Sequence, residues 1–216
     1  MTDRISPGLW RLYVITDPKA SRGRSHLQVA EAAIVGGADV LQLRDKEASS
    51  GMLYRVALQL RKLTRDAKVP FIVNDRLDIA LAADADGVHV GQTDLPASVV
   101  RGIIGPGKIL GVSVDTVEEA VLAEKDGADY LGVGPVFEAR GTKPDAGEPL
   151  GVDRIARIRR RCRLPIVAIG GIDAENARVA REAGADAVAV ISAIVAADDI
   201  AQAARRLKRI LEGTCQ

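Results

Sequence analysis

Two acidic residues stand where they could hold a divalent cation. Asp75 follows the apolar run 71–73, and Asp94 follows the apolar run 87–90 further along the chain. A few hard oxygen ligands, with room left for water and phosphate, are what Mg²⁺ prefers in proteins. Each aspartate also stands before a helical stretch, where Asp is a frequent N-cap. On these residues alone, magnesium ligand and helix cap are both open interpretations.

A group of polar side chains in the segment 41–46 suits an anion. The period of two in a strand places Gln42, Arg44 and Lys46 on one side and the two leucines on the other. Arginine offers an anion a planar fork, and lysine offers it a point charge. Because such groups are costly inside a protein without a partner, the pattern favours an anion site over a strand end with solvated charges.

Other candidates depend more on their surroundings. Ser113 stands near the end of the apolar run 109–114, where its hydroxyl could contact a ligand or cap the next helix. Lys143 lies in the long irregular segment 134–151, and loops of that length tend to be functional. We interpret it as a second phosphate-binding cation, with a solvated loop lysine as the alternative. His89 lies inside an apolar run, and we interpret it as a hydrogen-bonded core residue without a catalytic role.

A phosphate site is also indicated near the end of the chain. The run 166–169 is followed by Gly170 and Gly171, and the run 187–191 is followed by Ser192. Glycine permits close approach of the backbone, and a helix N-terminus offers free N–H groups to an oxyanion. In barrels, a phosphate site between the seventh and eighth strands is recurrent.

The elements that must position these residues alternate along the chain. Short apolar runs alternate with stretches rich in Ala, Leu, Glu and Arg at helical spacing, which predicts parallel strands joined by helices. The predicted strands are 12–16, 40–43, 71–73, 87–90, 109–114, 130–136, 166–169 and 187–191, and the clearest helices are 26–35, 53–64, 116–125 and 200–211. Eight such units predict an α/β fold, a (β/α)₈ TIM barrel, as a single domain over 1–216. A doubly wound open sheet is the alternative, weakened because no G-x-G-x-x-G follows the first strand.

An internal repeat supports this organisation. Gly-Ala-Asp or Ala-Asp precedes the strands that begin near residues 40, 87, 130 and 187. Glycine suits the end of a helix, and aspartate disfavours its continuation. We interpret the repeat as a structural signal that ends each helix before the next strand, without a functional role.

Composition excludes several classes of partner. Thirty Lys and Arg against 29 Asp and Glu give a net charge of +1, which offers no field for nucleic acid or an anionic membrane, and aromatic residues are only 3%. The arginines at 157–163 are predicted to be a solvated helix face. Neither Cys162 nor Cys215 has metal-site spacing, and the first residues lack a signal-peptide pattern, so we expect a cytoplasmic protein.

Short motifs occur at strand ends along nearly the whole chain. They are LYVITD at 12–17, QLRDK at 42–46, VNDR at 73–76, GVHVGQ at 87–92 with Asp94, GVS at 111–113, Thr142-Lys143, and AIGGI at 168–172. In this order and spacing, the motifs resemble those of the thiamine phosphate synthase family.

The resemblance implies an activity and a set of site residues. The expected enzyme joins 4-amino-5-hydroxymethyl-2-methylpyrimidine diphosphate to 4-methyl-5-(2-phosphoethyl)thiazole, giving thiamine monophosphate and pyrophosphate, with Mg²⁺ as its ion. Carried over to this sequence, the metal ligands are Asp75 and Asp94. The pyrimidine diphosphate contacts are Gln42, Arg44, Lys46, Asn74, Ser113 and Lys143, and the thiazole phosphate contacts are Gly171, Ile191 and Ser192.

The chain departs from the family pattern after the sixth predicted strand. Relatives usually have Thr-x-Thr-Lys there, whereas this chain has Arg140-Gly141-Thr142-Lys143, one residue later after Phe137. We expect the Arg140 guanidinium to bind the thiazole phosphate and Thr142 to remain a substrate contact.

The implied reaction needs no protein nucleophile. Diphosphate leaves a benzylic-type carbon beside an electron-rich aminopyrimidine, and the thiazole nitrogen attacks the resulting cation. We expect the catalytic groups that stabilise the leaving diphosphate to be Arg44, Lys46, Ser113 and Lys143. A thiazole tautomerase-like isomerase and a non-catalytic thiamine phosphate binder are the alternative functions. The sequence does not determine the oligomeric state, and a homo-oligomer is one possibility.

Overall fold

The protein is a closed barrel of parallel strands in the computed structural model, which describes residues 6–138, 149 and 151–213. Each strand pairs with the next in sequence, and β1 pairs with β8 to close the barrel. The strands are β1 (Leu12–Thr16), β2 (Val40–Leu43), β3 (Phe71–Asn74), β4 (Gly87–Val90), β5 (Ile109–Val114), β6 (Tyr130–Val133), β7 (Ile166–Ile169) and β8 (Ala187–Val190). The predicted TIM barrel is confirmed, and the open sheet is excluded.

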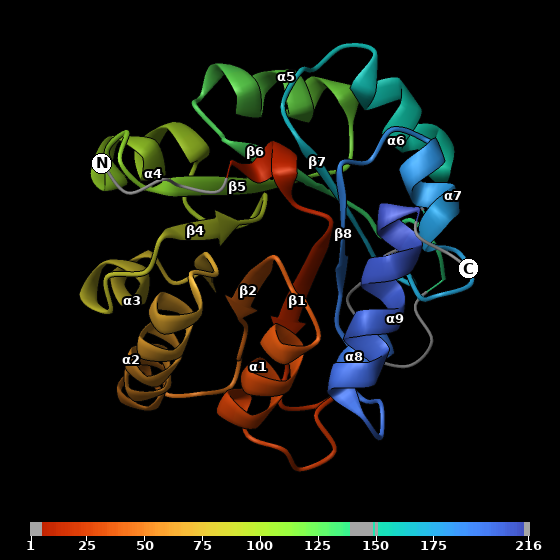
Figure 1. Ribbon diagram of the computed structural model, residues 1–216. Coiled ribbons are helices and arrows are strands. Elements are labelled where there is room, and N and C mark those ends of the chain that lie inside the picture. The colour runs from red at the N-terminus through yellow and green to blue at the C-terminus, as the bar shows by residue number, and fades with distance from the viewer. Residues whose placement is uncertain (1–5, 139–148, 150, 214–216) are drawn as a thin grey trace.

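The helices form a ring outside the strands (Figure 1). A short 3-10 helix at Pro7–Leu9 precedes β1. The α-helices are α1 (His26–Val35), α2 (Ser50–Ala67), α3 (Leu77–Ala82), α4 (Ala97–Ile104), α5 (Val117–Lys125), α6 (Val152–Arg159), α7 (Ala177–Glu182), α8 (Ser192–Val195) and α9 (Ile200–Glu212). None of the helices in this described part of the chain is long and apolar enough to cross a bilayer.

Local sequence explains where several elements begin and end. Ser25 and Thr116 each form a capping box with the residue three positions on, so α1 and α5 begin where an N–H acceptor is available. The prediction for the sixth strand was too long, because the strand ends at Val133. Pro135 stands two residues further on, and proline has no N–H to continue the ladder.

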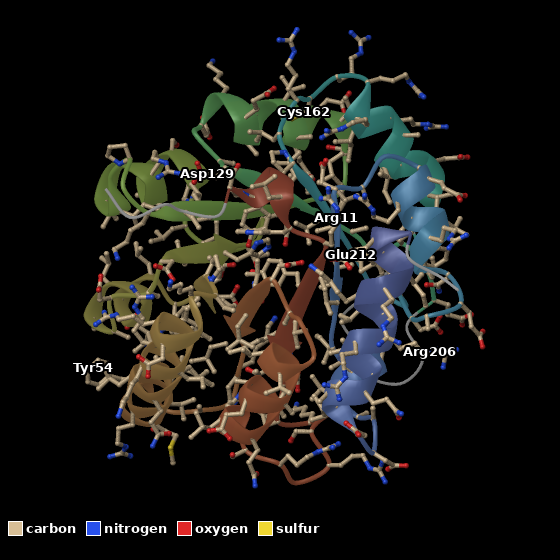
Figure 2. The ribbon with its side chains drawn as sticks, viewed as in Figure 1. Arg11, Tyr54, Asp129, Cys162, Arg206 and Glu212 are labelled. Atoms are coloured by element: carbon tan, nitrogen blue, oxygen red, sulfur yellow. The ribbon has the colours of Figure 1, made fainter. Side chains whose placement is uncertain are left out.

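Polar and charged side chains gather on the outside of the molecule. Figure 2 shows Tyr54 on α2 and Arg206 on α9 at the periphery, where side chains point away from the strands. The strands are buried almost throughout, and Trp10, Tyr13 and Tyr130 are among the largest fully buried side chains. These three rings pack edge to face or tilted, with centroids 5.3–6.0 Å apart. They fill the barrel with aromatic rings that carry polar atoms.

Four aspartates of the sequence repeat tie neighbouring strands together at the amino-terminal end of the barrel. Each aspartate donates its N–H to the carbonyl of a residue at or next to the start of the preceding strand, and its carboxylate accepts that residue's N–H. The pairs are Asp39 with Leu12, Asp86 with Phe71, Asp129 with Leu110 and Asp186 with Ile166, all at 2.7–2.9 Å. The sequence repeat predicts only that these aspartates end helices, and not that they bind a neighbouring strand.

A cation from a helix completes each of these four sites. The pairs are Asp39 with Lys208 of α9 at 2.5 Å, Asp86 with Arg61 of α2 at 2.8 Å, Asp129 with Arg101 of α4 at 2.6 Å, and Asp186 with Arg159 of α6 at 3.5 Å. We call the four aspartates with their backbone and cation partners the aspartate clamps. A hydrogen bond to a charged group contributes about 1.5–3 kcal/mol, so we expect the clamps to stabilise the barrel.

The clamps also correct the prediction for one arginine of the run at 157–163, whereas Arg157, Arg160, Arg161 and Arg163 are exposed as predicted. Helix α6 ends at Arg159, so the later arginines of the run lie beyond it. The Arg159 side chain is about one-third exposed and binds Asp186, and it is therefore not part of a freely solvated face.

Candidate active site

The predicted site residues that the structure describes lie at the carboxyl-terminal end of the barrel. Gln42 is in β2, and Arg44 and Lys46 follow it. Asn74 ends β3, Ser113 is in β5, and the remaining residues follow β3, β4, β7 and β8: Asp75, Asp94, Gly171, Ile191 and Ser192. The loop residues Arg140, Thr142 and Lys143 lie outside the described residues, so the predictions for them stay predictions.

Asp75 and Asp94 come together, and we call them the carboxylate pair. The pKa of Asp75 is raised to about 6, first by burial and then by repulsion and a hydrogen bond with the neighbouring Asp94 carboxylate. Lys46 and Arg44 act in the opposite direction. Two carboxylates in one partly buried place gain from a cation between them.

The helix-cap interpretation of these two aspartates does not hold. Helix α3 follows Arg76 and α4 follows Pro96, and neither helix has a side-chain cap. Asp75 adopts a positive φ of 59°, and its N–H donates to the carbonyl of His89 at 2.8 Å. One Asp94 oxygen accepts the Gly91 N–H at 2.8 Å. The backbone therefore holds Asp75 through its own N–H and Asp94 through one carboxylate oxygen, and neither carboxylate caps a helix.

Arg44 is held by a residue that the sequence analysis did not assign. The Arg44 guanidinium donates to the carboxylate of Asp17, which directly follows β1. Asp17 is buried, and its other oxygen accepts the Lys19 N–H at 2.9 Å. The position of Asp17 directly after a predicted strand is the sequence feature that could have identified it as a site residue. The pair fixes a cation at the mouth of the barrel.

A second set of contacts supports the loop that carries Lys46. His26 of α1 bonds Thr16 Oγ1 through Nδ1 at 2.8 Å and approaches Asp45 Oδ2 through Nε2 at 3.4 Å. Asp45 Oδ1 accepts the N–H groups of Glu47 and Ala48, both at 3.0 Å. The turn on either side of Lys46 is thus fixed by its own backbone and by α1.

A row of hydrogen bonds crosses the interior of the barrel. Gln42 Nε2 donates to the Tyr13 hydroxyl at 2.8 Å, and the hydroxyls of Tyr13 and Tyr130 are 2.9 Å apart. His89 Nδ1 lies 2.9 Å from the Tyr130 hydroxyl, and His89 Nε2 lies 2.8 Å from Ser113 Oγ. Burial raises the pKa of both tyrosines. The row joins two predicted substrate contacts, Gln42 and Ser113, through residues that were not predicted to matter.

These contacts exclude the helix-cap interpretation of Ser113. Helix α5 is capped by Thr116, whose hydroxyl accepts the Glu119 N–H at 3.1 Å. The Ser113 hydroxyl instead forms a hydrogen bond with His89. His89 is a hydrogen-bonded residue of the barrel interior, as the sequence indicated.

The ends of β7 and β8 lie side by side, since Ile169 pairs with Ala189. Gly171, with a φ of +64°, approaches the preceding loop so closely that a Cβ would lie 2.5 Å from the Glu138 carbonyl oxygen. Ile191 precedes α8, and Ser192 is its first residue. Only glycine fits at 171, which follows β7, and the other two residues predicted to hold a phosphate follow β8, the strand beside it.

Comparison with known proteins places the chain in a family. The model of the family described as "Thiamine monophosphate synthase" matches residues 12–194. A thiamine-phosphate synthase of Chloroflexus aurantiacus is 58% identical, covering 95% of this chain and 94% of its own, and one of Moorella thermoacetica is 53% identical, covering 94% and 96%. The solved structure of a thiamine phosphate pyrophosphorylase from Pyrococcus furiosus superposes with a TM-score of 0.88 at 40% identity, covering 97% of this chain and 99% of that one. The chain belongs to the thiamine monophosphate synthase family.

Proposed function

We propose that the chain is a thiamine-phosphate synthase, which joins the pyrimidine diphosphate to the thiazole phosphate and releases thiamine monophosphate and pyrophosphate. The observation that carries this proposal is the carboxylate pair beside Arg44 and Lys46 at the carboxyl-terminal end of the barrel. Substrates with a diphosphate leaving group need both a cation site and fixed positive charge. The names of the relatives support the same activity.

The carboxylate pair fits a magnesium ion. Among the residues that the structure describes, no group of three or more His, Cys, Asp or Glu side chains could hold a metal. Mg²⁺ is commonly held by one or two carboxylates, with water and substrate phosphate completing its shell. Asp75 and Asp94 would hold the ion, which when bound supplies positive charge to the diphosphate.

The cations at the site would act on the leaving group. The bond that breaks joins the pyrimidine methylene carbon to a diphosphate oxygen, and its electron pair leaves with the oxygen. Arg44, fixed by Asp17, and Lys46 would stabilise the charge that develops there, with Lys143 as the third cation. Asn74 and Ser113 would hold the same substrate through hydrogen bonds.

The thiazole phosphate would lie at the other side of the barrel mouth. Gly171, Ile191 and Ser192 would bind it where β7 and β8 end, with Arg140 and Thr142 of the sixth loop. The bond that forms joins the thiazole nitrogen to the methylene carbon. The protein's task is to hold the two partners in line, which is a large source of rate acceleration.

The experiment that tests this function measures both products. Purified protein is mixed with both substrates and Mg²⁺, and thiamine monophosphate and pyrophosphate are followed, with a chelator-treated sample alongside. We expect both products in equal amounts, and only with the metal. Absence of product from folded protein and intact substrates would overturn the proposal. Binding of thiamine monophosphate would then indicate a non-catalytic binder, and conversion of a thiazole tautomer would indicate an isomerase.

A further inference from the structure

The row of hydrogen bonds inside the barrel satisfies all its members when it runs in one direction. Gln42 donates to the Tyr13 oxygen through its amide nitrogen, and the Tyr13 hydrogen finds its acceptor in the row if it points to Tyr130. Tyr130 would then donate to Nδ1 of His89, and Nε2 would carry the proton that His89 donates to Ser113 Oγ. Each hydroxyl has one hydrogen to donate, so each donation fixes the next.

The direction determines what the two ends offer to a ligand. In this direction Ser113 Oγ accepts from His89, which leaves the Ser113 hydrogen to be donated elsewhere. At the other end, Gln42 has used an N–H on Tyr13, and its Oε1 remains an acceptor. An anionic diphosphate oxygen needs a donor, and the amino group of an aminopyrimidine needs an acceptor.

We propose that Tyr13, Tyr130 and His89 are positioning residues whose hydrogen-bond row turns the Ser113 hydroxyl hydrogen toward the substrate diphosphate and Oε1 of Gln42 toward the aminopyrimidine. The proposal rests on the proposed function for the identity of the ligand. The reverse direction would present serine lone pairs to a diphosphate oxygen, where two acceptors repel.

The surroundings preserve this direction. Tyr13 and Tyr130 are fully buried, so water does not compete for their hydroxyls. Burial raises the pKa of both phenols, and they stay neutral donors at physiological pH. A buried polar row that is fully satisfied is rigid, and losing one member leaves its neighbours without a partner.

The proton position on His89 tests the direction without any activity assay. The chain has two histidines, so ¹⁵N NMR of the imidazoles gives two sets of signals, and a His26→Gln variant assigns them. We expect neutral His89 with its proton on Nε2. A proton on Nδ1, or a doubly protonated ring at neutral pH, would overturn the proposal.

A double-mutant cycle tests the link to Ser113. We expect Tyr130→Phe to lower kcat/KM about 10-fold, mainly through kcat because charge develops on the diphosphate as it leaves. In the Ser113→Ala background, the same change should have less than a 2-fold effect, because the hydroxyl that the row positions is already absent. Equal effects in both backgrounds would reduce Tyr130 to a structural role.

Three further variants control for folding and for general loss of a hydroxyl. Tyr54→Phe removes a hydroxyl from a side chain at the periphery of the molecule (Figure 2) that is not part of the row, and should leave kcat/KM unchanged. His89→Gln retains an N–H that can donate to Ser113, whereas His89→Leu does not. We expect Gln to retain at least 5-fold more activity than Leu, and equal losses would contradict the proposal. If Tyr130→Phe fails to fold, Tyr13→Phe replaces it in the cycle.

These measurements separate the two proposals. If the wild-type protein is active but His89 carries its proton on Nδ1, or the double-mutant cycle is additive, the synthase function stands and the positioning role is overturned. A folded wild-type protein that makes no product overturns the function, and with it the ligand assigned to the row.

Discussion

The two ends of the barrel use the same residue type in opposite ways. At the amino-terminal end, each aspartate of the clamps has a backbone N–H and a helix cation as partners. At the carboxyl-terminal end, the carboxylate pair places one carboxylate against another and raises the pKa of Asp75. A carboxylate that has both an N–H donor and a cation as partners supports the fold. A carboxylate that faces another carboxylate marks a place where a ligand can bind.

The largest expected effect is on activity, at the carboxylate pair. Asp75→Asn should lower kcat/KM by about 100-fold or more, because an amide is a poor magnesium ligand beside a diphosphate. Asparagine tolerates the positive φ at this position, so the fold should persist. Initial rates at saturating Mg²⁺ measure the effect. Activity within 3-fold of the wild type would remove Asp75 from the metal site.

The next effect is on stability, at an aspartate clamp. Asp129→Ala should lower the free energy of unfolding by about 2 kcal/mol, because the Leu110 N–H and Arg101 lose a charged acceptor. Urea unfolding measures it, and kcat at 25 °C should change little. Asp129→Asn keeps one acceptor oxygen and should lose less. A clamp variant that is stable but inactive would contradict the division between the two ends.

A third effect is the pH dependence of the metal-free protein. The pKa of Asp75 is about 6, above its ordinary 3.8, so between pH 4 and 6 the folded state binds a proton that the unfolded state releases. Stability should therefore fall as pH rises through this window, by about 1 kcal/mol once solvent screening is allowed for. The Asp75→Asn variant should not show this part of the decrease in stability with pH. The measurement is urea unfolding of both proteins at pH 4.5 and 7, and identical pH profiles would disprove it.

The smallest effect tests whether charge pairing alone explains the clamps. Arg22 and Asp198 are 2.6 Å apart, the same separation as Arg101 and Asp129, but their side chains are 60% and 93% exposed. Asp198→Asn should change the free energy of unfolding by less than about 0.5 kcal/mol. Urea unfolding beside the Asp129 variants makes the comparison direct. A loss equal to that of Asp129→Ala would show that the backbone N–H in the clamp adds nothing.

Much of the fold was predictable because local patterns define it. Helix α1 covers residues 26–35 as predicted, since a capping box begins it. The positive φ of Gly37, Gly127 and Gly184 agrees with the role of glycine in the repeat. The clamps themselves were not predicted, because Lys208 and Asp39 are 169 positions apart.

The candidate site was predictable to a different extent. Residue types at strand ends pointed to Asp75, Asp94 and Arg44, because the carboxyl ends of parallel strands converge. Asp17 was missed, since its partner Arg44 lies 27 positions away. The row through Tyr13 and Tyr130 was missed for the same reason, with 117 positions between the two hydroxyls. Only the closed barrel brings these groups together.

The aspartate clamps have a consequence for the order in which the chain is made. Arg61, Arg101 and Arg159 each precede the aspartate that they bind, so three clamps have all their parts once that aspartate has been synthesised. The first clamp differs, because Asp39 and Leu12 are made early and Lys208 comes from the last helix. During N-to-C synthesis, the clamp at the amino-terminal end of β1 is thus completed only after α9 has been made.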